Sequence, residues 1–68
     1  MNKIECVKFC ENIIKEMWNK YGNPTDYNTR HNTYLHCKDV CKTNGYIGNC
    51  FMEIWNKASD NAHRNKIN

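Results

Sequence analysis

Apolar residues recur with the three- and four-residue spacing of an α-helix along three stretches of this chain. The first stretch is residues 2–21, where the apolar stripe of an amphipathic helix consists of Cys6, Cys10, Ile13, Ile14, Met17 and Tyr21. Asn2 followed by Glu5 has the spacing of a capping box. Gly22 supplies the left-handed position that commonly ends a helix. The pattern therefore predicts a first helix over residues 2–21.

A second helix is predicted over residues 24–43. Its start is marked by Asn23 as N-cap, Pro24 in the first helical position and Asp26 in the first turn. Its inward stripe consists of Tyr27, Arg30 or His31, Tyr34, Cys37 and Cys41. Residues 27–33 have poor helix propensity, so an alternative interpretation has regular helix only from about residue 32. The turn between the two helices predicts an antiparallel hairpin.

Residues 50–63 predict a third amphipathic helix, with Asn49 as its N-cap. Its apolar stripe consists of Phe51, Ile54, Trp55, Ala58 and Ala62. This stripe needs a surface to cover it, which is either the hairpin or a partner protein. Residues 64–68 are polar and predict a frayed tail. The fold class is thus an all-α hairpin with a third helix, in a single domain over residues 1–68.

Two Cys-x-x-x-Cys pairs, Cys6/Cys10 and Cys37/Cys41, are placed symmetrically about the predicted turn. Residues at i and i+4 share one helix face, so each pair presents two thiols to the opposing helix. In an antiparallel hairpin Cys6 then lies opposite Cys41, and Cys10 lies opposite Cys37. We predict that these two couples form structural disulfides.

Two other interpretations of the four thiols stay open. One is a zinc site made from the thiolates, with His31 or His36 as a further ligand, although zinc ligand pairs more commonly stand two residues apart. The other is redox catalysis, for which a pair inside a helix lacks the motif that lowers a thiol pKa. Disulfides are therefore preferred, and neither a metal nor a cofactor is expected.

Cys50 has no partner in this symmetric arrangement. Near the start of the third helix, it is either a free or intermolecular thiol or a small buried residue beside Phe51.

Composition explains why a chain of this kind needs cross-links. Of its 68 residues, 40% are hydrophobic with the cysteines included, and the single leucine is Leu35. An apolar core of this size gives a small domain only marginal stability. A disulfide from Cys6 to Cys41 should add about 4 kcal/mol by restricting the unfolded chain. Disulfides persist in oxidising compartments, so the chain is expected outside the cell, in the secretory lumen or in the mitochondrial intermembrane space.

Several classes of function are not expected. No stretch reaches the ~20 apolar residues of a membrane span, and the chain begins without the apolar region of a secretory signal. The formal net charge of +3 is modest and both signs are scattered, which argues against nucleic acid as a partner. His31, His36 and His63 have no nucleophile in a catalytic arrangement, so an enzyme is not expected.

Aromatic and aliphatic residues outside the cysteine stripe are candidates for contact with a protein partner. Val7, Phe9 and Trp18 form a second apolar face on the first helix. The candidate docking residues are these three together with Phe51, Ile54 and Trp55 of the third helix.

The nested cysteine pairs over residues 6–41 resemble the coiled-coil-helix-coiled-coil-helix proteins of the mitochondrial intermembrane space. The Cys-x-x-x-Cys spacing is similar to that of the small Tim chaperones of the same compartment. The resemblance implies the disulfides Cys6–Cys41 and Cys10–Cys37. It also implies an accessory subunit or assembly component of a respiratory-type membrane complex, with other protein subunits as partners. Members of that family are imported without a cleaved presequence, which agrees with a start at Met1.

A second resemblance points to secreted proteins. Helical-hairpin toxins and plant hairpin inhibitors also carry twin Cys-x-x-x-Cys pairs. The run from Cys37 through Cys41 to Cys50 is similar to the core of scorpion-type toxins and defensins. The Cys-x-Cys strand of those folds is absent here, because Trp55, Asn56 and Lys57 stand at the matching positions. This resemblance implies a disulfide-stabilised toxin or inhibitor of a channel or protease, which is the alternative expectation.

Overall fold

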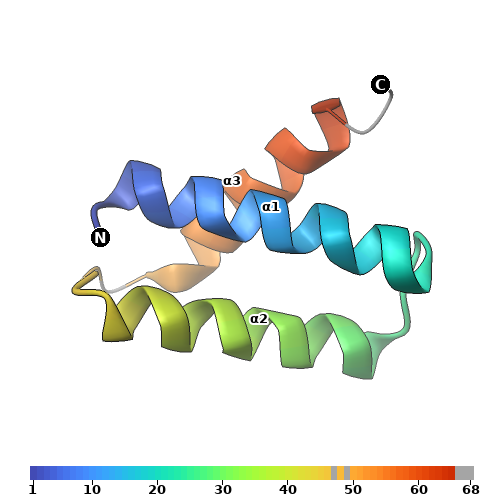
Figure 1. Cartoon of the computed structure of the whole chain (residues 1–68), viewed down its shortest axis with the longest axis horizontal. Helices are drawn as coiled ribbons and strands as arrows, with labels where there is room; N and C mark the ends of the chain where they lie inside the picture. The colour runs from blue at the N-terminus through green and yellow to red at the C-terminus, as the bar shows by residue number, and fades with distance from the viewer. Residues whose placement is uncertain (47, 49, 66–68) are drawn as a thin grey trace.

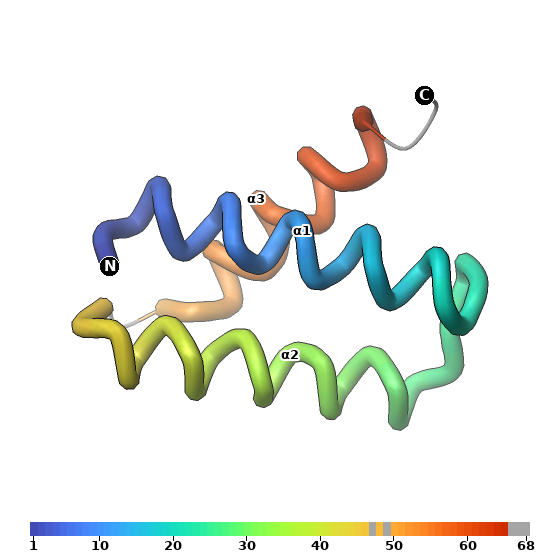
Figure 2. Tube along the Cα trace, viewed as in Figure 1, coloured from blue at the N-terminus to red at the C-terminus, as the bar shows by residue number. Residues whose placement is uncertain are grey.

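Two antiparallel helices, α1 (Lys3–Tyr21) and α2 (Tyr27–Thr43), form a hairpin, and a third helix, α3 (Phe51–Asn65), crosses behind it (Figure 1). The computed structural model describes residues 1–46, 48 and 50–65. Within these residues there is no β-strand. The trace in Figure 2 shows that α3 runs obliquely to α1, and most of its packing is against α1. The predicted all-α hairpin with a third helix is confirmed.

Local signals set both ends of α1. The side-chain oxygen of Asn2 accepts a hydrogen bond from the Glu5 backbone N–H at 2.8 Å, and the Glu5 carboxylate accepts one from the Asn2 N–H at 2.9 Å. This reciprocal pair is the predicted capping box. At the other end Gly22 has a φ of 93°, and its N–H donates to the Trp18 carbonyl at 2.8 Å. A residue with a Cβ would be strained at that φ, which is why glycine stands there.

The start of α2 differs from the prediction. The helix begins at Tyr27 with Asp26 as its N-cap, so the predicted start at Pro24 with Asn23 as cap is wrong. The Asn23–Pro24 peptide bond is cis. Packed helix axes lie about 8–10 Å apart, so the chain needs several residues to pass from one axis to the next before a new helix can begin. Residues 22–26 make this crossing.

The low-propensity first half of α2 is nevertheless helical, so the alternative start near residue 32 is wrong. The Thr33 hydroxyl donates to the Thr29 carbonyl at 2.8 Å. The ring of His31 lies between those of Tyr27 and Tyr34, with centroid distances of 5.6 and 6.4 Å. Tyr34 in turn meets α3. These contacts stabilise the helical conformation of this segment, and helix propensities, which describe single residues, do not account for them.

The apolar stripe of α3 is buried against the hairpin, as predicted. It consists of Phe51, Ile54, Trp55, Ala58 and Ala62, all classed as core. Tyr34 of α2 contacts Phe51 and Trp55 edge-on, with centroid distances of 5.3 and 5.5 Å. Because Ala58 and Ala62 are fully buried and small, α3 can approach α1 closely at these positions.

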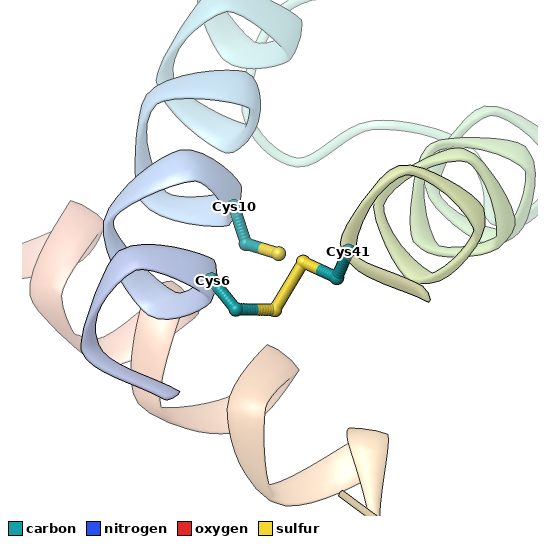
Figure 3. A group of neighbouring side chains, drawn as sticks. All are labelled: Cys6, Cys10 and Cys41. Atoms are coloured by element: carbon teal, nitrogen blue, oxygen red, sulfur yellow. A yellow bond between two sulfur atoms is a disulfide. The ribbon is translucent and has the colours of Figure 1, made fainter. Parts of the chain in front are cut away.

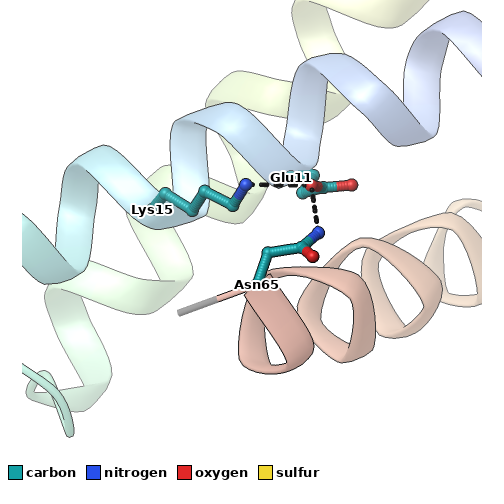
Figure 4. Close-up of polar contacts among 3 residues, drawn as sticks. All are labelled: Glu11, Lys15 and Asn65. Carbon is teal, nitrogen blue, oxygen red and sulfur yellow. Dashed lines mark hydrogen bonds and ion pairs between the residues drawn. The ribbon is translucent and has the colours of Figure 1, made fainter. Parts of the chain in front are cut away.

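Contacts with α1 extend to the last turn of α3. The side-chain amide of Asn65 donates to the Glu11 carboxylate at 3.1 Å, and Glu11 also pairs with Lys15 at 3.1 Å (Figure 4). The His63 ring lies 4.7 Å from the Trp18 ring. Of the predicted tail over residues 64–68, the first two belong to the helix, and residues 66–68 lie outside the described residues. The predicted cap Asn49 also lies outside them.

Candidate functional site

Four cysteines meet between the first half of α1 and the last half of α2. Cys6 and Cys10 come from α1, Cys37 and Cys41 come from α2, and all four side chains have 0% exposure. Because the helices are antiparallel and each pair spans one helical turn, the order of the two pairs is inverted across the interface. The register predicted from the symmetry about the turn therefore brings the four thiols into one buried cluster.

The outer pair of this cluster is covalently joined. Cys6 and Cys41 form a disulfide with a Cα–Cα distance of 5.7 Å, which lies in the usual range for such bonds. The bond links residues 35 positions apart. Closing a loop of that length in the unfolded chain corresponds to about 4 kcal/mol of stability on the loop-entropy account. The predicted cross-link between the two helices is confirmed for this pair.

The inner pair consists of two buried thiols, Cys10 and Cys37. The two side chains are hydrogen-bonded, and this bond lowers the pKa of Cys10 even though burial works in the opposite direction. The same hydrogen bond, together with burial, raises the pKa of Cys37. A disulfide between Cys10 and Cys37, which oxidation of the two thiols would form, stays a prediction.

The geometry also bears on metal binding. The Sγ atoms of Cys6, Cys10 and Cys41 lie within 4.8 Å of one another, and Figure 3 shows the Cys10 sulfur pointing toward the Cys6–Cys41 bond. Zinc needs thiolate ligands. The disulfide occupies two of these three sulfurs, so the oxidised cluster has no thiolate set for a metal. The chemistry that the arrangement supports is cross-linking of the two helices.

Short-range contacts hold the chain segments next to the disulfide. The α-amino group of Met1 donates a hydrogen bond to the carbonyl oxygen of Asn44 just beyond the end of α2. The N–H of Tyr46 donates to the Cys41 carbonyl at 2.9 Å. Gly45 between them has a φ of 94°, a conformation that favours glycine. The start of α1 and the end of α2 are thus joined at two neighbouring points, the disulfide and the hydrogen bond from Met1 to Asn44.

The six predicted docking residues lie in two environments. Phe51, Ile54 and Trp55 are buried in the contact between α3 and the hairpin. Val7, Phe9 and Trp18 are half-buried and pack against the same core. Within this chain, all six therefore have a packing role. Contact between any of them and a partner stays a prediction.

Cys50 and the histidines lie outside the cysteine cluster. Cys50 is an exposed thiol just before α3, so its interpretation as a buried residue is wrong, while a bond from it to another chain stays a prediction. His31 is stacked between two tyrosines, and His63 lies against Trp18. His36 is exposed. These positions do not bring the three imidazoles together.

Sequence reasoning missed one feature, an open groove between α1 and α3. Ile4 and Val7 of α1 line it with Lys57 of α3, and its volume is about 590 Å³. The available signal was the apolar pair Ile4 and Val7 at helical spacing, off the cysteine stripe and next to lysines. Only the packing of α3 on α1 turns that signal into a groove.

None of the three described helices combines the length and the apolar content that crossing a membrane requires. Comparisons with known proteins find no family model, no curated protein and no solved structure that matches this chain.

Proposed function

We propose that this chain is a non-catalytic structural protein, an accessory subunit or assembly component of a mitochondrial membrane complex on its intermembrane-space side. The observation that carries the proposal is the register of the helical hairpin. Cys6 is bonded to Cys41, and Cys10 faces Cys37 one turn further along. This nested order is the one expected from the resemblance to twin-cysteine helical-hairpin proteins of that compartment.

A structural role agrees with the burial of the sulfur atoms. All four cysteines of the cluster have 0% exposure, so a substrate has no access to the disulfide or to the Cys10 thiol in the folded chain. Catalytic thiols need partial exposure and an electropositive surrounding. Buried sulfurs contribute stability instead, in a chain whose largest fully buried side chains are Ile14, Ile54 and the four cysteines.

The redox requirement of the cross-link supports the proposed compartment. A disulfide persists where the surroundings are oxidising and is rare in the cytosol. Both the intermembrane space and the secretory route meet this condition. The nested pairs over residues 6–41 favour the first, because they are the motif of the resemblance and include the bonded couple Cys6–Cys41.

The proposal is tested by locating the untagged chain with an antibody in cells that make it. We expect the chain in the mitochondrial fraction, released or made protease-sensitive when the outer membrane is ruptured. On a native gel it should migrate with a complex far larger than 8.1 kDa. Recovery from the culture medium would favour a secreted toxin or inhibitor instead. A chain that stays monomeric inside mitochondria would rule out a subunit role.

A further inference from the structure

We propose that the groove between α1 and α3 binds an acidic amphipathic helical segment of a partner protein. This inference rests on the proposed function, since it names the chemistry by which a structural subunit would contact its neighbour. The groove lies between α1 and α3. It has a volume of about 590 Å³ and is lined by described residues of the two helices.

Two neighbouring residues in the lining of the groove are apolar. Ile4 is 77% exposed, the largest exposed fraction among the large hydrophobic side chains that the structure describes. Val7 stands one turn further along α1 and is half-buried against the core. Residues at i and i+3 are neighbours on a helix surface, so the two side chains form a short continuous strip. Such a strip between two helices suits an apolar anchor of a third helix.

Three cations surround this strip. Lys3 and Lys8 flank it on α1, and Lys57 faces it from α3. No ion pair involves these lysines among the residues that the structure describes. Lys8 also attracts the Glu11 carboxylate, so the charges of Lys3 and Lys57, with part of that of Lys8, are available to carboxylates of a ligand, which argues for an acidic segment.

The two acidic side chains of the groove differ in their contacts. Glu11 is held by Lys15 at 3.1 Å and by the Asn65 amide at 3.1 Å, as Figure 4 shows. Burial opposes its charged form, but these contacts, together with the nearby charge of Lys8, leave the pKa of Glu11 below its usual value. Glu53 also lines the groove and has no ion pair among the described residues. The lysines therefore outnumber the acids still available to a ligand.

A peptide fits this site better than an anionic membrane surface does. The site is concave, whereas a helix that lies on a membrane presents a convex apolar face. The Asn61 amide also lines the groove and provides hydrogen-bonding groups that a peptide side chain can use. A helix laid between α1 and α3 would complete a four-helix arrangement.

The test uses the isotopically labelled, oxidised chain and two synthetic peptides of about 18 residues, a length that supports an isolated helix. Both peptides carry the same leucine stripe, one with glutamate and one with lysine at the remaining positions. We expect the acidic peptide to shift backbone amide resonances of residues 3–11 and 53–61, and the basic peptide to leave them unchanged. Equal shifts with both peptides, shifts spread over all three helices, or no shifts at millimolar peptide would overturn the proposal.

Matched variants separate the groove from general charge and hydrophobicity. Lys8→Glu and Ile4→Asn should each raise the dissociation constant at least about tenfold. The controls Lys38→Glu and Leu35→Asn, both exposed on α2, should change it less than about twofold. All four substitutions are at exposed positions, and the dispersion of the spectra reports whether each variant is folded. A groove variant that binds like its control contradicts the assignment.

Two further measurements distinguish the groove from its alternatives. Phosphatidylcholine vesicles containing phosphatidylglycerol should not bind the chain. Binding that Ile4→Asn abolishes would mean that the surface is a membrane site. In cells, loss of Lys8→Glu from the assembly that holds the wild-type chain would support the groove. If both chains remain in the assembly, the groove proposal fails while the proposed function stands, and a wild-type chain found alone contradicts the proposed function itself.

Discussion

The two helices that pack on α1 are held there by different means. Helix α2 fully buries only its two cysteines, and the Cys6–Cys41 bond joins it to α1. Helix α3 has no cysteine and buries five apolar side chains. The comparison shows that this small chain uses a covalent link where the apolar surface is scarce, and ordinary packing where a full stripe is present.

Removing the covalent link should have the largest effect. The double variant Cys6→Ala with Cys41→Ala should lose about 4 kcal/mol of unfolding free energy, because the unfolded chain regains its loop entropy. Amide hydrogen exchange should accelerate more in α2 than in α3. Urea unfolding followed by circular dichroism measures the first quantity, and exchange by NMR the second. Cys50→Ala, at an exposed thiol, is the control and should change neither.

Removing part of the apolar contact between α3 and the hairpin should cause the next largest loss of unfolding free energy. Ile54 is 1% exposed, so Ile54→Ala should cost about 3 kcal/mol through lost burial and a residual cavity. Met52 is on the same helix and 53% exposed, so Met52→Ala should cost less than about 0.5 kcal/mol. Exchange should now accelerate in α3 first while α2 stays linked to α1. Equal acceleration of exchange in α2 and α3 would contradict the claim that the two helices are held by different means.

The contact that joins α2 directly to α3 is smaller. Tyr34 touches Phe51 and Trp55 edge-on, and such ring pairs contribute about 0.5–1.5 kcal/mol beyond burial. We expect Tyr34→Leu, which keeps most of the apolar area, to destabilise the chain by about 1 kcal/mol. A double-mutant cycle with Trp55→Leu measures the coupling. Additive losses would mean that the rings do not interact.

The smallest effect concerns the polar contact at the end of α3. The folded-state pKa of Glu11 is lowered, so its stabilising effect is present above the unfolded pKa of about 4.3 and is lost as pH falls through the lower folded value. Stability should therefore decline from about pH 5 to pH 3 by less than about 1 kcal/mol through this group. Glu11→Gln should flatten that part of the profile. An unchanged profile would exclude the contact.

Features set by neighbouring residues were predictable from the sequence. Asn2 with Glu5 and Gly22 gave both ends of α1, because a cap needs only groups a few residues apart. The apolar stripe of α3 was equally predictable, because it depends only on the spacing of its residues along one helix. The start of α2 was not, because Asn23 and Asp26 are both capable caps and the distance between two packed helices decides which one acts. Local sequence does not contain that distance.

The candidate site likewise has one feature that the sequence predicts and one that it does not. The partner of Cys6 followed from symmetry about the turn, which requires only that the hairpin closes. The groove did not follow, because Ile4 and Lys57 come together only when α3 crosses α1 at its observed angle. Burial of Val7, Phe9 and Trp18 depends on that crossing too.

The Cys6–Cys41 bond also determines how the chain responds to mechanical tension. A force applied to its two ends passes through the disulfide and bypasses the loop between Cys6 and Cys41, which are 35 positions apart. Helix α3 and the short segment before Cys6 can be pulled straight, while the hairpin interior carries no load. The fully stretched oxidised chain is then shorter than the reduced chain by roughly 120 Å, at about 3.5 Å per residue.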